Sequence, residues 1–261
     1  MTFSIAVAGK GGTGKTSLTS LLIRYLKQSG SGPILAVDAD ANANLGESLG
    51  LSVEKTIGSV IAGFNEEKIN IPPGMTKEAY LEVKLSEVIV ESQGLDLITM
   101  GRGEGPDCYC YPNLLLRKFI DRLAANYAYI VMDNEAGMEH LSRRTTRDID
   151  ALLLISNHSV KGVRTIARIR DLVTELKLNV KRQWVIINAV PGKLDPVISE
   201  EVARLGIDSV ATVPFDEAIH DYDLKVRPLV ELPDTSEAVQ AVNDIMDNVL
   251  NKQGLHSAGS A

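Results

Sequence analysis

Residues 9–16 read Gly9-Lys10-Gly11-Gly12-Thr13-Gly14-Lys15-Thr16, between a short apolar run and a segment with apolar residues three and four apart. This is the pattern G-x-x-x-x-G-K-[ST] in its strand-to-helix context. Glycines let consecutive N–H groups face phosphate oxygens, a lysine places its charge beside the phosphates, and a threonine hydroxyl can bind Mg²⁺. The stretch predicts a phosphate-binding loop whose nucleotide-binding residues are Gly11, Gly12, Thr13, Gly14, Lys15, Thr16 and Ser17.

The composition is that of a globular protein. The 261 residues are 44% hydrophobic and 23% charged, with a formal net charge of −7, and these values exclude a disordered or fibrous chain. The negative charge disfavours nucleic acid and anionic membrane as partners. No apolar run approaches the length of a membrane span. We therefore expect a cytoplasmic protein with one domain over residues 1–253 and a flexible tail over residues 254–261.

Strand-like and helix-like segments alternate along the chain. Helical spacing covers residues 16–28, 112–126, 163–176, 198–205 and 236–250, whereas residues 56–92 are ambiguous and are expected to form an excursion at one edge. Such alternation predicts an α/β fold, a mostly parallel doubly wound sheet with helices on both faces. The seven predicted strands are residues 5–8, 34–37, 95–100, 129–132, 152–155, 184–187 and 210–213.

A second lysine, Lys10, lies inside the loop, although one lysine already serves the phosphates. It is either an exposed, solvated side chain or a group that reaches the nucleotide of another subunit. The run GKGGTGKT resembles the deviant Walker A motif of the MinD, nitrogenase iron-protein and ParA class of dimeric ATPases. The resemblance implies a P-loop ATPase that hydrolyses ATP to ADP with Mg²⁺. It also implies a homodimer in which Lys10 crosses the two-fold interface and acts in catalysis with Lys15.

Three carboxylates end or follow predicted strands. Asp38 and Asp40 follow the second strand, and Asp133 ends the strand over residues 129–132. We expect Thr16 and Asp133 to form the Mg²⁺ site, and the resemblance implies that Asp38 lies near the same cation, mostly through water. The resemblance implies that Asp40 orients the attacking water. For Asp38 and Asp40, the alternative is a solvated turn rich in Asp and Asn.

Two further segments carry interpretations based on the same resemblance. It implies that Asn188, at the end of a strand, pairs with the adenine edge, and that Pro214 and Phe215 lie under the base. An asparagine at a strand end is otherwise an ordinary turn residue. At Glu135 many members of the class have a different residue. The Glu135 side chain either contacts Mg²⁺ or the metal-site loop, or is a solvated acid.

The two cysteines of the chain are Cys108 and Cys110, in one tripeptide. They are too close for an ordinary disulfide. In an extended segment both sulfurs lie on one face, and two thiolates are half of a tetrahedral site. A two-fold axis would complete a Cys₄ site for Zn²⁺ or, if square-planar, for Ni²⁺. The alternative is a pair of packed apolar thiols.

The loop GRGEGPDCYCYP and the later run DNEAG, together with the deviant Walker A motif, resemble the CooC-type nickel-insertion ATPases. The resemblance implies an ATP-dependent metallochaperone with nickel carbon monoxide dehydrogenase as its client. A different class of function is a MinD- or ParA-like positioning ATPase that binds membrane or DNA. Such a protein needs a basic amphipathic tail or a strong basic field, whereas the helix predicted over residues 236–250 is acidic on its polar face.

Overall fold

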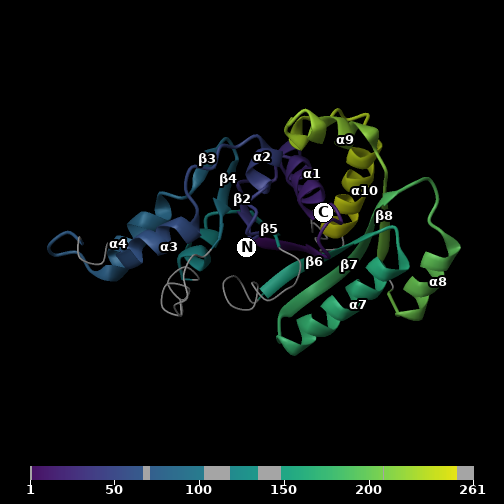
Figure 1. Cartoon of the computed structure of the whole chain (residues 1–261), viewed down its shortest axis with the longest axis horizontal. Helices are drawn as coiled ribbons and strands as arrows, with labels where there is room; N and C mark the ends of the chain where they lie inside the picture. Colours follow the sequence, from purple (N-terminus) through teal and green to yellow (C-terminus); the bar gives the residue numbers. More distant parts are fainter. Residues whose placement is uncertain (1, 67–70, 103–117, 135–147, 208, 252–261) are drawn as a thin grey trace, which may run out of the picture.

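A computed structural model describes residues 2–66, 71–102, 118–134, 148–207 and 209–251. Its centre is an eight-stranded sheet with the order β3-β4-β2-β5-β1-β6-β7-β8 (Figure 1). Every strand pair is parallel except β3 with β4. The strands are β1 (Phe3–Gly9), β2 (Ile34–Asp38), β3 (Val90–Ser92), β4 (Leu95–Thr99), β5 (Tyr129–Asp133), β6 (Asp148–Asn157), β7 (Asn179–Val190) and β8 (Val210–Pro214).

The seven predicted strands are confirmed, and the eighth, β3, was not predicted. It is three residues long with one exposed and two half-buried residues, so it carries no apolar run. It pairs back on β4 through a tight turn at Gly94, whose φ is +74°. A short antiparallel strand at an edge is common on an otherwise parallel sheet.

Helices cover both faces of the sheet (Figure 1). One face carries α1, α2 and α10, and the other packs against α3, α4, α7, α8 and the helical residues 118–124. The doubly wound α/β prediction is therefore confirmed. The elements are α1 (Lys15–Gln28), α2 (Leu45–Leu49), α3 (Ile57–Glu66), α4 (Lys77–Ser86), α7 (Val160–Glu175), α8 (Pro196–Arg204), α9 (Glu217–Leu224), the 3-10 turn η1 (Leu229–Glu231) and α10 (Glu237–Asn251); residues 118–124 are also helical.

The apolar spacing of the helices determines which side each buries. In α10, Val239, Val242, Met246 and Val249 recur every three or four residues and are at most 1% exposed. The helix predicted over residues 236–250 therefore docks on the core, beside α1. Since apolar burial contributes about 25 cal/mol per Å², this stripe is a main reason why the last helix stays on the sheet.

The ambiguous residues 56–92 contain α3, α4 and β3. Both helices lie beyond the β3 edge, as the expected excursion requires. Of the helix predicted over residues 112–126, only residues 118–124 are both described and helical. The predicted tail, residues 254–261, lies outside the described residues. None of the helices that the structure describes is long and apolar enough to cross a membrane.

Candidate nucleotide site

The predicted phosphate loop joins the central strand β1 to α1 at the carboxyl edge of the sheet. The hydroxyl of Thr13 donates to the carbonyl oxygen of Lys10 at 2.8 Å, and the ammonium of Lys15 donates to the same oxygen at 3.4 Å. Lys15 is 7% exposed, whereas the Lys10 side chain is exposed. The two lysines therefore differ in position: Lys15 is inside the loop and Lys10 is on its surface.

Strand β7 supports the loop from the other side. The amide nitrogen of Asn188 donates to the carbonyl oxygen of Thr13 at 2.9 Å. Gly14 has a φ of +83°, and a Cβ there would lie 2.3 Å from that amide nitrogen. Only glycine satisfies both demands. The residue expected to read adenine thus also fixes the loop.

A hydroxyl and a carboxylate meet at the start of α1. Asp133 is 1% exposed, and its Oδ2 accepts a hydrogen bond from the Thr16 hydroxyl at 2.6 Å. Its Oδ1 is buried and has no hydrogen-bond partner among the described residues. Burial raises the pKa of Asp133 to about 7, against the Thr16 hydrogen bond. A buried carboxylate oxygen without a donor, beside a threonine hydroxyl, fits a hard divalent cation such as Mg²⁺.

Asp38, the neighbour of Asp133 in the sheet register, is fully buried. Its two oxygens accept the backbone N–H groups of Asp40 at 3.1 Å and of Leu45 at 2.9 Å. Burial raises the pKa of Asp38 to about 6, although both of these bonds lower it. Asp38 therefore ties down both ends of the loop between β2 and α2. Asp40 is half-buried, and its carboxylate accepts the N–H of Asn42 at 2.8 Å.

A polar cavity of about 450 Å³ adjoins the end of the phosphate loop, at Thr16 and Ser17. This is within the size range of small-molecule sites. No sequence pattern indicated its walls, because charged residues at helix ends are common on any surface. Its remaining lining residues are Asn44, Glu47, Ser48, Asp223, Val226, Arg227 and Leu229.

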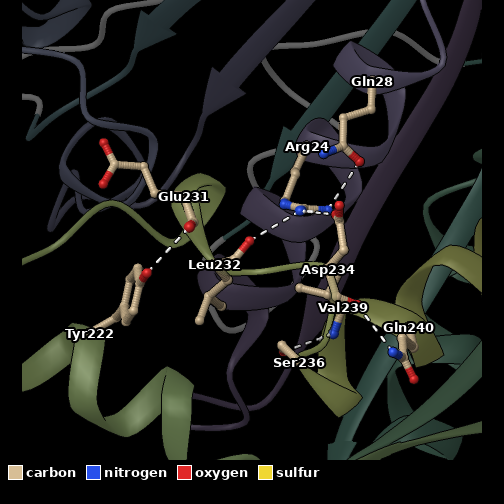
Figure 2. Close-up of polar contacts among 9 residues, drawn as sticks. All are labelled: Arg24, Gln28, Tyr222, Glu231, Leu232, Asp234, Ser236, Val239 and Gln240. Carbon is tan, nitrogen blue, oxygen red and sulfur yellow. Dashed lines mark hydrogen bonds and ion pairs between the residues drawn. The ribbon is translucent and has the colours of Figure 1, made fainter.

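The link that follows α9 is fixed to α1, as Figure 2 shows. Arg24 of α1 is 5% exposed; it donates to the carbonyl oxygen of Leu232 at 3.0 Å and pairs with Asp234 at 2.5 Å. On the other side, the Tyr222 hydroxyl donates to the carbonyl oxygen of Glu231 at 3.2 Å. These contacts hold one wall of the cavity in place.

Asp216 follows the predicted base contacts Pro214 and Phe215. Its Oδ1 accepts the N–H of Ala218 at 2.8 Å, and its Oδ2 accepts the Ser236 hydroxyl at 2.6 Å. Oδ2 also accepts the N–H of residue 238 at 3.1 Å, so one side chain caps both α9 and α10. Burial would raise its pKa, but these hydrogen bonds hold it below the usual range. Phe215, beside it, is 53% exposed.

Comparison with known proteins gives the class of this site. The family model described as the CobQ/CobB/MinD/ParA nucleotide binding domain matches residues 4–229. The chain belongs to this family. A family member with 43% identity over 251 residues is an uncharacterised ATP-binding protein of Methanocaldococcus jannaschii; the match covers 95% of this chain and 99% of that protein.

Two further proteins to which the chain is similar carry specific names. The carbon monoxide dehydrogenase accessory protein CooC of Rhodospirillum rubrum is 28% identical over 230 residues, which is 84% of this chain and 86% of that protein. The septum site-determining protein MinD of Pyrococcus horikoshii, solved with Mg-ADP, superposes with a TM-score of 0.71 at 21% identity. That match covers 97% of this chain and 98% of the MinD chain.

The structure brings together most of the residues that the sequence singled out. Thr16 is hydrogen-bonded to Asp133. Lys15 and Asn188 both donate to carbonyl oxygens of the phosphate loop, Lys15 to that of Lys10 and Asn188 to that of Thr13. Cys108, Cys110 and Glu135 lie outside the described residues. Within the part that the structure describes, no three His, Cys, Asp or Glu side chains cluster as a metal site.

Proposed function

We propose that this protein is a Mg²⁺-dependent ATPase with a single domain over residues 1–253. The observation that carries the proposal is the contact between Thr16 and Asp133 beside a buried, unpartnered carboxylate oxygen, next to a complete phosphate loop. The family is a nucleotide-binding one. A buried carboxylate with a raised pKa is a feature expected of a functional site more than of a structural one.

In this proposal the loop residues 11–17 bind the phosphates through their N–H groups, and Lys15 neutralises charge on them. Thr16, Asp133 and Asp38 would hold Mg²⁺, which would supply charge stabilisation to the phosphates. Asp40 orients the attacking water. The base lies against Asn188, Pro214 and Phe215.

The exposed Lys10 supports the homodimer. Its carbonyl oxygen is used inside the loop, whereas its side chain lies on the surface. A cation in that position can reach the γ-phosphate of a second copy, as an arginine finger does in trans. ATP would then bring two subunits together, and hydrolysis would release them.

For the cellular role we propose metallochaperone activity, with nickel insertion into carbon monoxide dehydrogenase as the process. Two observations support it: the Rhodospirillum rubrum accessory protein among the relatives, and the Cys-Tyr-Cys tripeptide. In the dimer, Cys108 and Cys110 of both subunits would supply four thiolates to Zn²⁺ or Ni²⁺.

A positioning ATPase is the second candidate. The septum site-determining protein MinD of Helicobacter pylori, 23% identical over 257 residues, favours it. The net charge of −7 opposes binding to DNA or anionic lipid. ATP-dependent co-sedimentation with anionic vesicles or with DNA would select this candidate over the metallochaperone.

Lys10→Ala tests the dimeric mechanism. We expect the variant to keep ADP binding and to lose both ATP-dependent dimerisation, measured by size-exclusion chromatography, and hydrolysis. Lys27→Ala, a lysine in the last turn of α1, is the control that should leave both unchanged. Normal turnover by Lys10→Ala would refute the role of the lysine in trans.

Metal analysis of the wild type and of the variant Cys108→Ala/Cys110→Ala tests the metallochaperone role separately. We expect about one Zn²⁺ or Ni²⁺ per wild-type dimer and none in the variant, with ATP hydrolysis retained in both. Equal metal content in the two proteins would refute the thiolate site and leave the ATPase proposal intact.

A further inference from the structure

The charges of the chain are divided between the two faces of the sheet. Residues 214–251, which contain α9 and α10, carry nine Asp and Glu against two Lys and Arg, so this segment alone accounts for the net charge of −7. Residues 160–193, which contain α7 and β7, carry eight Lys and Arg against two Asp and Glu. Since α10 and α7 pack on opposite faces (Figure 1), the field over α7 is positive although the chain is acidic.

The order of charges along α7 is the reverse of the order that the helix dipole favours. Its exposed cations, Lys161, Arg164 and Arg168, lie in the amino-terminal half, whereas Asp171 and Glu175 lie in the carboxyl-terminal half. The first turn of α7 has no acidic residue and its last turn has no basic one. Acids near the amino end and bases near the carboxyl end would stabilise the helix. The stability of α7 therefore does not explain these cations.

A nearly buried carboxylate of α8 holds two arginines at the surface. The Glu201 side chain is 9% exposed, and it accepts the Nε–H of Arg164 at 2.7 Å and that of Arg204 at 3.0 Å. The side chains of Arg164 and Arg204 are 55% and 61% exposed. Among the described residues, the Nη groups of Arg164 have no acceptor. One negative charge thus orients two guanidinium groups, and N–H groups remain for a further carboxylate.

Two more cations and an apolar side chain lie on the same two helices, which pack against each other. Lys161 and Arg168 form no ion pair with any part of the chain that the structure describes. With Arg164 they are spaced by three and four residues, so the three form a stripe about 10 Å long on α7. Val197, one turn before Glu201 on α8, is 59% exposed. The α7–α8 surface consists of Lys161, Arg164, Arg168, Val197 and Arg204.

We propose that the α7–α8 surface docks an acidic segment of a partner protein. Carboxylates of the partner bind the outward N–H groups of Arg164 and Arg204 and the charges of Lys161 and Arg168. Val197 supplies an apolar contact beside them. Arginine is enriched at protein interfaces, and a guanidinium that is oriented before binding loses less freedom when the partner arrives.

The size and limits of the surface favour a protein segment over nucleic acid. About three residues of an extended strand, or two turns of a helix, span the stripe of about 10 Å. Asp171 and Glu175 follow the stripe on the same helix. A DNA duplex has a phosphate charge about every 1.7 Å and would continue past the stripe towards these acids, within the field of an acidic protein. A short acidic segment ends before it reaches them.

A charge reversal with a matched control tests the proposal. Binding of a fluorescein-labelled poly-L-glutamate peptide to the full chain is measured by fluorescence anisotropy at low salt. Lys161→Glu/Arg168→Glu should raise the Kd about tenfold or more, because two attractive charges become repulsive. Lys27→Glu/Lys77→Glu reverses two exposed lysines of α1 and α4. Two reversals take the net charge from −7 to −11 in both variants, yet the control should change the Kd by about twofold at most.

Three single variants separate docking from helix stability. Lys161→Glu should raise the midpoint of thermal unfolding, because an acid in the first turn of α7 complements the helix dipole, and it should weaken peptide binding. Glu175→Lys, at the other end of α7, should raise the midpoint for the same reason without weakening peptide binding. Arg164→Lys keeps the charge but has no planar fork for a carboxylate, so the Kd should rise about two- to fivefold.

Four results would each overturn the proposal. They are no binding of the peptide by the wild type, equal losses in the two double variants, tighter binding of a DNA duplex or of phosphatidylglycerol vesicles than of the peptide, and self-association of the wild type that Lys161→Glu/Arg168→Glu abolishes. The last result would assign the surface to the acidic α10 face of a second copy. None of these residues takes part in the proposed hydrolysis of ATP, so that proposal stands or falls separately.

Discussion

Asp133 and Asp216 are carboxylates near the carboxyl ends of two parallel strands, β5 and β8, and their surroundings are opposite. Asp216 accepts three hydrogen bonds, which hold its pKa below the usual range. Asp133 accepts one on Oδ2 and none on Oδ1 among the described residues, and burial raises its pKa to about 7.

The difference indicates that Asp216 has a structural role, whereas Asp133 is suited to bind a ligand. A buried charge is costly unless it is paired or binds a metal. At Asp216 the protein itself supplies the donors. At Asp133 it leaves an oxygen unsatisfied at the end of the phosphate loop, which is useful only if a cation completes the site.

The largest effect should come from Asp133→Asn. Mg²⁺-dependent ATP hydrolysis should fall about a hundredfold or more, because an amide oxygen carries no charge for the cation. Steady-state phosphate release measures it. Asp150→Asn is the control, since Asp150 lies near the amino end of β6 and bonds to Ser4 and Lys181 instead. Equal turnover by Asp133→Asn and wild type would show that Asp133 has no role in hydrolysis.

Asp216→Ala should have the next largest effect, on stability. The variant loses three hydrogen bonds, to the N-termini of α9 and α10 and to the Ser236 hydroxyl, and each contributes about 1 kcal/mol, so the free energy of unfolding should fall by about 2–3 kcal/mol. Denaturation in urea measures it. Asp216→Asn keeps one acceptor oxygen and should fall between the alanine variant and the wild type. A loss below about 0.5 kcal/mol would show that other donors and acceptors replace this side chain.

A pH series should reveal the raised pKa of Asp133. Burial raises the folded pKa of Asp133 to about 7, from an ordinary value of 3.8. The folded state therefore binds more protons than the unfolded state, and stability falls as the pH rises from about 4 to about 7. Relative to Asp133→Asn, the wild type should lose about 2 kcal/mol over that range, less than the full shift because Asp38 titrates nearby. A constant difference between the two proteins would contradict the raised pKa.

The smallest effect should come from Glu201, which accepts hydrogen bonds from Arg164 and Arg204 at 2.7 and 2.5 Å. The hydrogen bonds from Arg204 and Arg164 lower its pKa to about 2, from 4.5. Its contribution is complete above pH 4.5 and is lost as the pH falls towards 2. Glu201→Gln should lower the unfolding midpoint slightly, and high salt should remove most of the difference. A salt-independent loss would indicate packing instead.

Much of the architecture could be predicted from the sequence. Buried parallel strands are continuous apolar runs, and each of the seven was visible for that reason. The phosphate loop was visible because its glycines have no other use in that spacing. The strand β3 was not, since three half-exposed residues carry no pattern.

The site could be predicted only in part. Asp133 was identifiable because it ends an apolar strand, but its unpartnered oxygen depends on how α1 packs. The hydrogen bond from Asn188 to Thr13 joins residues 175 positions apart in the sequence, so no local pattern could predict it.

The position of β1 has a consequence for how the chain is made. This strand leaves the ribosome before β5 and β6, yet it lies between them in the sheet, and its residue Phe3 pairs with Tyr129. At about 5–20 residues per second, residue 157 at the end of β6 follows roughly 8–30 s later. Until β5 has emerged, β1 has no partner on either side, and until β6 has emerged it has a partner on one side only. The strand that leads into the phosphate loop is thus made before both of its neighbours in the sheet, and the candidate nucleotide site can be completed only after β6 has emerged.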